Sequence, residues 1–289
     1  MQENFVQCLS PSGLHNMHYT EWGARDNPRI VLCVHGLTRN CRDFDALAQS
    51  LEKDFRVVCP DIVGRGQSEW LADKELYGLP QYLADINALL ARLTADAEHA
   101  NEREILWVGT SMGGMIGMLL ASLARTPVRK LVLNDVGTLI PKAALERIGK
   151  YAGKAPAFNT LEEANAYVRY VSVSFGPHSD AQWDHLTRHN ARQNADGAWV
   201  MNYDPGIALP FQKGPINDIE LWSYYDRIAC PTLLLRGAIS DLLLKDTALA
   251  MTQRGPRARL VEFAGVGHAP MLMVEDQIKV VREFLTAST

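Results

Sequence analysis

Ser111 carries the clearest chemical signal in the chain. It lies in Gly109-Thr110-Ser111-Met112-Gly113, which fits the pattern G-x-S-x-G, with strand-favouring residues before it and helix-favouring residues after it. A serine on so sharp a strand-to-helix turn takes an unusual backbone conformation, and glycines two residues away on either side leave room for it. The turn would also raise the hydroxyl near the positive end of the helix. The segment therefore predicts a nucleophilic serine.

A serine hydroxyl is a weak nucleophile until a base removes its proton, and the base needs an acid that fixes its tautomer. His268 lies in a loop, Gly265-Val266-Gly267-His268-Ala269-Pro270, whose glycines and proline exclude a helical face. Asp241 follows a predicted strand, 27 residues before this histidine. The chain order serine, acid, histidine suits a serine on a strand-to-helix turn. We predict that His268 is the general base and that Asp241 orients it.

Asp135 is a competing acid, because it also follows a predicted strand, in Val-Leu-Asn-Asp-Val-Gly, at the same edge of the sheet. The context of the motifs favours Asp241 over Asp135 as the partner of His268.

Two backbone N–H groups are needed to hold the negative charge that develops on an attacked carbonyl oxygen. Met112 directly follows the nucleophile, and Leu37 lies in the loop His35-Gly36-Leu37 after another predicted strand. These two amides are predicted to form the oxyanion hole, while His35 is expected to hold its loop in place.

The elements that position these residues alternate along the chain. Periodicity predicts strands at 15–22, 29–34, 56–59, 104–108, 128–134, 232–235 and 260–263, and helices at 43–52, 81–95, 112–124, 246–252 and 274–286. Such alternation indicates an α/β fold, with a mostly parallel sheet covered by helices on both faces.

The alternation stops between residues 138 and 218, where helix-like stretches rich in aromatic residues follow one another. We expect a core domain at 1–137 and 219–289, interrupted by a helical cap at 138–218. A small helical lobe needs its own core, and some of its aromatic side chains should face the active site.

Composition limits the kind of partner. The chain has 289 residues, 47% of them hydrophobic, and a formal charge of −4 without a dense basic cluster. This composition favours neither a nucleic acid nor an anionic membrane as a partner.

The uncharged run 105–124 would suit a transmembrane helix, but its β-rich start and its Gly-Thr-Ser-Met-Gly-Gly turn favour a strand followed by a helix. Five cysteines without regular spacing and a start that lacks the features of a signal peptide indicate a soluble, cytoplasmic protein.

Five motifs in this order resemble the α/β-hydrolase superfamily from about residue 14 to the end of the chain. They are His35-Gly36-Leu37, the stretch from Asp61 through Gly64 and Gly66 to Ser68, the serine turn, Ser240-Asp241 with Leu243, and the His268 loop. The resemblance implies an eight-stranded sheet with a cap between its sixth and seventh strands. It also implies a serine esterase that cleaves small carboxylic esters, including lactones and hydroxyalkanoate oligomers, without a cofactor, and a structural role for Asp61.

Other activities on the same framework stay open. Carbon–carbon bond hydrolases resemble the chain in Ser-Met-Gly-Gly but typically have tryptophan where Ala269 stands, so they are the lesser interpretation. An acyltransferase would use the same residues with another acceptor, and a non-catalytic binding protein would be expected to lack part of the triad.

His185 and His189 have the spacing of a metal pair, but without an evident third ligand we expect no metal. Arg39 could reach a substrate carboxylate or point to solvent. The sequence does not indicate the oligomeric state.

Overall fold

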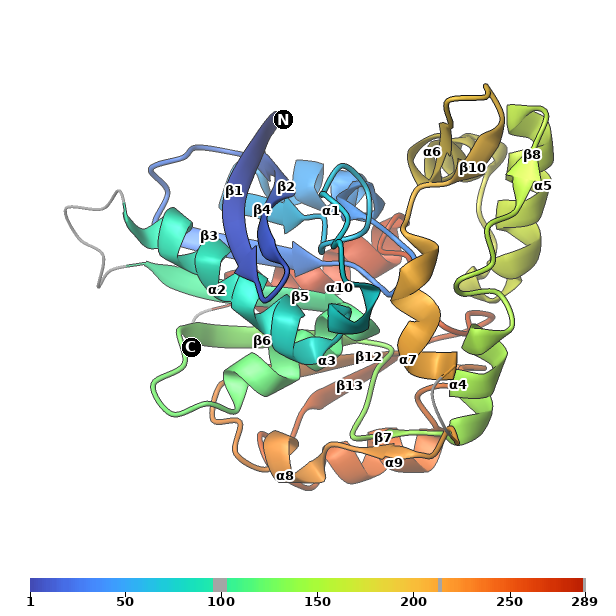
Figure 1. Cartoon of the computed structure of the whole chain (residues 1–289). Coiled ribbons are helices and arrows are strands. Elements are labelled where there is room, and N and C mark those ends of the chain that lie inside the picture. Colours follow the sequence, from blue (N-terminus) through green and yellow to red (C-terminus); the bar gives the residue numbers. More distant parts are fainter. Residues whose placement is uncertain (96–102, 213–214, 288–289) are drawn as a thin grey trace.

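The computed structural model describes residues 1–95, 103–212 and 215–287, and its centre is an eight-stranded sheet (Figure 1). The strand order is β1-β2-β4-β3-β5-β6-β12-β13. The strands are β1 (Gln2–Ser10), β2 (Gly13–Trp22), β3 (Arg29–Val34), β4 (Arg56–Pro60), β5 (Glu104–Thr110), β6 (Val128–Asn134), β12 (Thr232–Gly237) and β13 (Arg259–Phe263). Each neighbouring pair from β4 to β13 is parallel, whereas β2 is antiparallel to both of its neighbours. The predicted α/β class and the eight-stranded sheet are confirmed.

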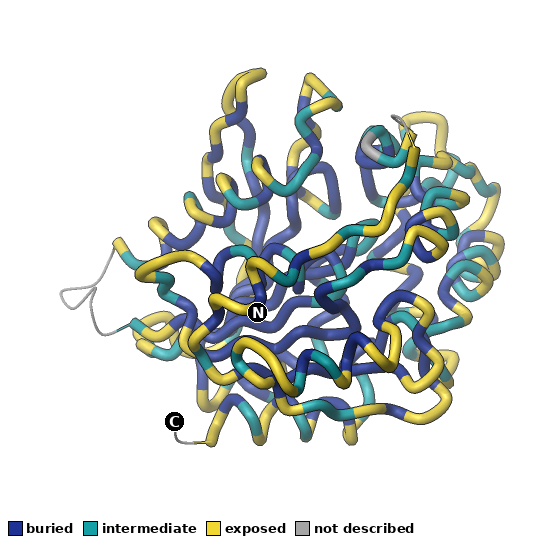
Figure 2. Tube along the Cα trace, turned by 90° about the horizontal axis from the view of Figure 1, so that it is seen from below, coloured by how far each residue is buried: buried dark blue, intermediate teal, exposed yellow. Residues whose placement is uncertain are grey.

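Helices cover both faces of the sheet, because its central strands are apolar on both sides. The helix α1 (Asp45–Leu51) and the C-terminal α10 (Glu275–Thr286) bury Leu47, Leu51 and Val281 against one face. The helices α2 (Leu79–Ala95), α3 (Met112–Ala121), α8 (Trp222–Tyr225) and α9 (Lys245–Met251) contribute to the apolar cluster on the other face. The central strands β3, β4, β5, β6 and β12 are almost wholly buried between these layers (Figure 2). This is the arrangement in which parallel strands consist of nearly continuous hydrophobic residues.

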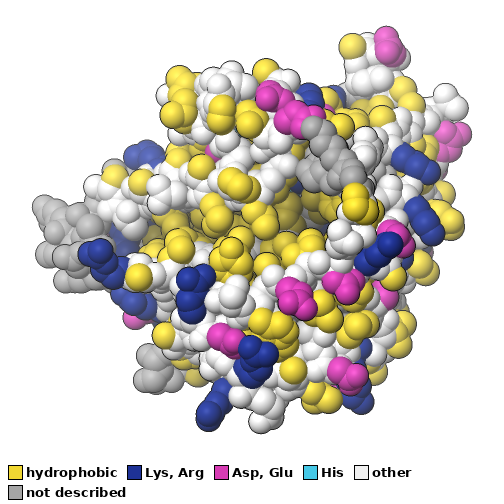
Figure 3. Space-filling model, turned by 60° about the horizontal axis from the view of Figure 1, so that its bottom comes forward, with side chains coloured by type: hydrophobic (Ala, Val, Ile, Leu, Met, Phe, Trp, Pro, Cys, Tyr) yellow, Lys and Arg dark blue, Asp and Glu magenta, His cyan; other side chains and the backbone are white. Residues whose placement is uncertain are grey.

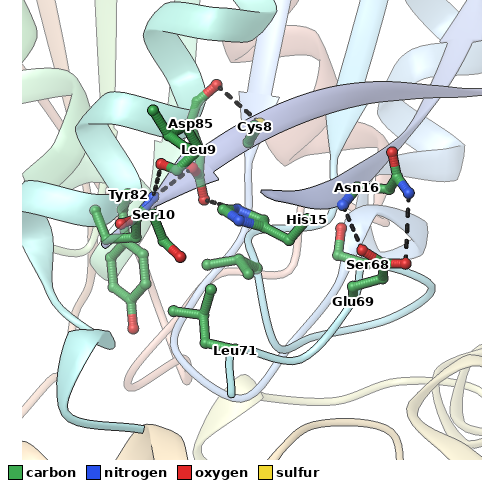
Figure 4. Close-up of polar contacts among 12 residues, drawn as sticks. Cys8, Leu9, Ser10, His15, Asn16, Ser68, Glu69, Leu71, Tyr82 and Asp85 are labelled. Atoms are coloured by element: carbon green, nitrogen blue, oxygen red, sulfur yellow. Dashed lines mark hydrogen bonds and ion pairs between the residues drawn. The ribbon is translucent and has the colours of Figure 1, made fainter. Parts of the chain in front are cut away.

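The first strand, β1, was not predicted from the sequence. It forms an antiparallel hairpin with β2 at one edge of the sheet, and its exposed side chains include Phe5 and Leu9. Figure 4 shows how the hairpin is fixed to α2: the His15 ring bonds the Asp85 carboxylate at 3.0 Å, and the Cys8 thiol faces the Asp85 carbonyl oxygen. Exposed and buried residues alternate in β1, because this antiparallel strand packs one face on the core and turns the other to solvent.

The uncharged run at 105–124 consists of β5, a sharp turn and α3, as predicted. In the described part of the chain, no helix combines the length and the apolarity needed to cross a membrane.

Most of the described residues of segment 138–218 lie beyond the carboxyl ends of the central strands, at the right of Figure 1. It begins at β7 (Leu139–Ile140), which pairs with β11 (Ile219–Glu220) where the chain returns to the core. Its helices are α4 (Lys142–Gly149), α5 (Leu161–Val171), α6 (Asp180–Asn190) and α7 (Leu209–Gln212). We refer to residues 138–218 as the cap segment.

The prediction of a helical insertion at 138–218 did not include every element of the cap segment. The segment also contains a three-stranded antiparallel sheet of β8 (Ala157–Phe158), β10 (Trp199–Met201) and β9 (Ala191–Gln193). These strands have only two or three residues each, which is too short for an alternating pattern to stand out in the sequence. Short 3₁₀ helices complete the described elements at Cys41–Phe44, Lys74–Leu76, Val173–Phe175 and Pro205–Ala208.

Candidate active site

Ser111 lies on the turn between β5 and α3, with φ 52° and ψ −114°. A positive φ is strained for a residue with a side chain, so close packing must hold it in place. A Cβ atom at Gly109 would lie 2.3 Å from the carbonyl oxygen of Gly113, and one at Gly113 would lie 1.9 Å from that of Val34. The two glycines of the motif are thus required by the close approach of three backbone segments.

His268 lies directly beside this serine. The Ser111 hydroxyl is 3.0 Å from His268 Nε2, within hydrogen-bonding distance. The histidine loop is held from both sides: Asn134 Nδ2 donates to the carbonyl oxygen of Pro270, and Ser174 of the cap segment donates to that of His268 at 2.6 Å. The Gly267 N–H donates in return to the Ser174 carbonyl oxygen. The cap segment therefore takes part in placing the histidine.

Asp135, and not Asp241, is the acid that contacts this histidine. Asp135 directly follows β6, is fully buried, and its Oδ2 lies 2.8 Å from His268 Nδ1. The same carboxylate accepts hydrogen bonds from the Gly237 N–H at 2.8 Å and from the Ser240 hydroxyl at 2.6 Å. Since a carboxylate only accepts, Nδ1 carries the imidazole proton and Nε2 faces Ser111 as an acceptor.

The prediction that Asp241 orients His268 is therefore wrong. Asp241 instead forms a two-pronged ion pair with Arg147 of α4, and about half of its side chain, 49%, is exposed. In the loop after β12 it is Ser240 whose side chain turns inward, where it bonds Asp135. Asp135 and the loop of Asp241 meet because β6 and β12 are neighbours in the sheet, and only the direction of each side chain distinguishes the two acids.

The two predicted oxyanion amides belong to segments that border Ser111. Met112 is the first residue of α3, so its N–H has no partner within that helix. The loop of Leu37 passes close to the serine, since a Cβ atom at Gly36 would lie 3.7 Å from the Ser111 Cβ. Arg65 anchors this loop: it is fully buried, and its Nε donates to the Leu37 carbonyl oxygen at 2.8 Å. No sequence motif indicated this role of Arg65.

His35 and Asp61 hold neighbouring loops, as expected. The Ile62 N–H donates to His35 Nε2 at 2.9 Å, and His35 Nδ1 donates to the Gly36 carbonyl oxygen. Burial lowers the pKa of His35 to about 4, which agrees with a neutral ring that both donates and accepts. The Asp61 carboxylate accepts from the backbone N–H groups of Cys41 and Gln67 and bonds the His18 ring.

Two pockets meet at Ser111. The smaller has a volume of about 70 Å³ and lies between the core and the cap segment, with Arg39, Arg147, Tyr151 and His268 among its lining residues. The larger, of about 550 Å³, is lined mainly by apolar side chains, including Met112, Met115, Ile207 and Phe211. Hydrophobic side chains gather in a hollow on the face that Figure 3 turns toward the viewer. Both pockets share Leu37, Ser111 and Ile148.

The two histidines of α6 have an acidic neighbour, Asp45, that could act as a third metal ligand and that the sequence did not indicate. One ligand atom each of Asp45, His185 and His189 lies within 4.8 Å of the others. Asp45 already forms an ion pair with Arg42, and His185 Nε2 bonds the Arg42 carbonyl oxygen at 3.0 Å.

Comparison with known proteins identifies the family. The family model described as "Alpha/beta hydrolase family" matches residues 31–283. The chain belongs to the α/β-hydrolase family. It is 47% identical to the 3-hydroxybutyrate-oligomer hydrolase of Cupriavidus necator over 98% of this chain and 97% of that protein.

Solved structures agree with this assignment. An α/β hydrolase from Novosphingobium aromaticivorans superimposes with a TM-score of 0.85 at 35% identity, over 98% of this chain and 97% of that one. A structure from Rickettsia typhi covers both chains completely, with a TM-score of 0.91 and 33% identity. The predicted family and fold are therefore confirmed. The predicted class of carboxylic ester hydrolase is confirmed as well, because other relatives are named esterases and lipases.

Proposed function

We propose that this α/β hydrolase cleaves esters through an acyl-enzyme on Ser111, with His268 as general base and Asp135 as the acid that orients it. The observation that carries the proposal is the unbroken chain of hydrogen bonds from the Ser111 hydroxyl through His268 to the buried Asp135 carboxylate. This geometry is the one that an activated serine nucleophile requires.

The reaction would proceed in two stages. His268 takes the Ser111 proton as the hydroxyl attacks the ester carbonyl, and the Leu37 and Met112 amides stabilise the oxyanion. His268 then gives this proton to the departing alcohol, which leaves the acyl group on the serine. Water, deprotonated by His268, hydrolyses the acyl-enzyme by the same route and frees the acid. Asp135 stabilises the imidazolium in each stage, and water is the only co-substrate.

We further propose that the natural substrates are short oligomers of 3-hydroxybutyrate or a closely related hydroxy acid. The support is the 47% identity with the Cupriavidus necator hydrolase along nearly the whole of both chains. The division into a core at 1–137 and 219–289 and a cap at 138–218 belongs to this proposal, with the cap segment as the roof of both pockets. Such a roof would exclude water and strengthen the oxyanion interactions beneath it.

The nucleophile is tested by Ser111→Ala. We expect this variant to fold and to lose several orders of magnitude in the rate of nitrophenyl butyrate hydrolysis. A serine-directed phosphonate should add its mass to Ser111 alone, located by peptide mass spectrometry. Ser50→Ala is the matched control, because Ser50 lies on α1 and its hydroxyl only donates to the Leu47 carbonyl oxygen. An active Ser111→Ala variant, or labelling at another residue, would overturn the proposal.

A further inference from the structure

The two pockets that meet at Ser111 correspond to the two sides of an ester bond. The departing alcohol receives its proton from the histidine, so it must lie on the histidine side of the serine. His268 lines the small pocket and is not among the residues that line the large apolar one. The small pocket therefore suits the alcohol, and the large pocket suits the acyl group.

Two arginines line this small pocket, and both are held in place by aspartates. Arg39 donates to Asp43 through Nε at 2.8 Å and Nη2 at 2.7 Å. Arg147 donates to Asp241 through Nε at 2.5 Å and Nη2 at 2.8 Å. Each ion pair uses the same edge of the guanidinium, which leaves Nη1, with its two N–H groups, on the side away from the aspartate.

Tyr151 also lines this small pocket, and its phenol is hydrogen-bonded with the Arg147 guanidinium. Burial raises the pKa of this phenol, while the charges of Arg147 and Arg39 oppose that rise. The phenol is therefore protonated, and its O–H can donate to a molecule in this pocket. A pocket of this size with fixed guanidinium and phenol donors suits a small anion that accepts several hydrogen bonds, and a carboxylate is such a group.

We propose that Arg147, Arg39 and Tyr151 bind the free carboxylate of the departing hydroxy acid, so that the enzyme removes units from the carboxyl end of an oligomer. The inference rests on the proposed function. In a chain of 3-hydroxy acids, the alcohol released from the last ester bond is the hydroxy acid that bears the terminal carboxylate. Hydrolysis of that bond adds one water: its OH goes to the new carboxyl group of the shortened chain, and its H completes the alcohol of the released monomer.

The first test compares the linear dimer of 3-hydroxybutyrate with its methyl ester, which lacks the terminal charge. The wild-type protein should hydrolyse the bond between the two units with a kcat/KM about ten-fold or more higher for the free acid, because hydrogen bonds to a charged group are strong. Arg147→Gln should lower this preference about ten-fold, chiefly through KM of the free acid. Tyr151→Phe removes one donor without changing the volume of the ring and should lower the preference by a smaller factor.

Arg169→Gln is the matched control. Arg169 is also an arginine of the cap segment, but it pairs with Asp180 and does not line the small pocket. The Arg169→Gln variant should prefer the free acid over the methyl ester by the same factor as the wild type. Equal rates on the two dimers in the wild type, or an unchanged preference in both Arg147→Gln and Tyr151→Phe, would overturn the inference.

The second test uses the wild-type protein alone and so does not depend on how a variant folds. In this test the trimer carries ¹³C only in its carboxyl-terminal unit, and mass spectrometry follows the released monomers. The labelled monomer should appear first. Unlabelled monomer appearing first or at the same rate would overturn the inference. Activity on the trimer without this order leaves the proposed function intact, whereas inactivity on both trimer and nitrophenyl butyrate would contradict the proposed function itself.

Discussion

At the scale of single residues, the site depends on which of two acids turns inward. Asp135 has φ 52°, a strained value, and its carboxylate meets Nδ1 of the His268 ring. The strain is offset by hydrogen bonds from Gly237, the last residue of β12, and from Ser240 in the loop of Asp241. The loop that was expected to supply the acid thus supplies donors to it.

Asp135→Asn should reduce turnover of nitrophenyl butyrate roughly 10³–10⁴-fold, because an amide at this position favours the wrong imidazole tautomer. Asp241→Asn should cost less than about ten-fold on this neutral ester, since Asp241 contacts Arg147 and not His268. Steady-state kinetics of the two purified variants, with urea unfolding as a check on their stability, would measure the difference. The opposite ranking would return the role of orienting acid to Asp241.

At the scale of elements, the loops after β3 and β4 are joined through His35, which accepts from the Ile62 N–H only while its ring is neutral. Its pKa is lowered to about 4 in the folded protein, against about 6.5 in the unfolded chain. Between these values the unfolded state binds the extra proton, so stability falls as the pH decreases through this window.

We expect His35 to contribute roughly 2 kcal/mol to the loss of unfolding free energy between pH 7.5 and pH 5. His35→Gln keeps a side-chain acceptor but does not titrate, so its unfolding free energy should change less over this range. Urea unfolding of both proteins at the two pH values measures the effect. His189, whose pKa is also lowered to about 4, adds a separate contribution that His189→Gln would isolate. Identical pH dependence in the wild type and His35→Gln would refute the role of His35.

At the scale of the whole molecule, the cap segment is fastened to the core on several sides. Backbone hydrogen bonds join Gly66 to Asn202 and Asp204 to Gly64, and the buried Asp204 carboxylate accepts from the Tyr77 hydroxyl at 2.7 Å. On the other side, Asn40 donates to the His189 carbonyl oxygen, and Ser174 bonds the His268 loop. Moving the cap segment away from the core would break several of these hydrogen bonds at once.

We therefore expect no activation at an oil–water interface. The rate on tributyrin should saturate smoothly as its concentration passes the solubility limit. Emulsified long-chain triglyceride should be hydrolysed poorly, because three long chains do not fit together into pockets of about 70 and 550 Å³. Titrimetric rates below and above the solubility limit would check this. A sharp rise in rate when droplets form would show that the cap segment opens at the interface.

The sequence by itself determined the features that depend on local rules. Alternating apolar segments predicted the parallel sheet, and the glycines around Ser111 and His268 predicted both residues, because a sharp turn restricts the residues that can form it. The expected structural roles of His35 and Asp61 also agree with their contacts. The edge strand β1 and the short strands of the cap segment were missed, since their pairing depends on partners elsewhere in the molecule.

Tertiary structure decided which acid meets the histidine. Asp135 and Asp241 both follow strands, and those strands are neighbours, so the spacing along the chain fits either acid. What distinguishes them is the direction of each side chain, which is set by the strained backbone at Asp135 and by Arg147, a residue of the cap segment 94 positions before Asp241. The sequence carries no local mark of such a contact, because it forms only when a helix of the cap segment packs over the core.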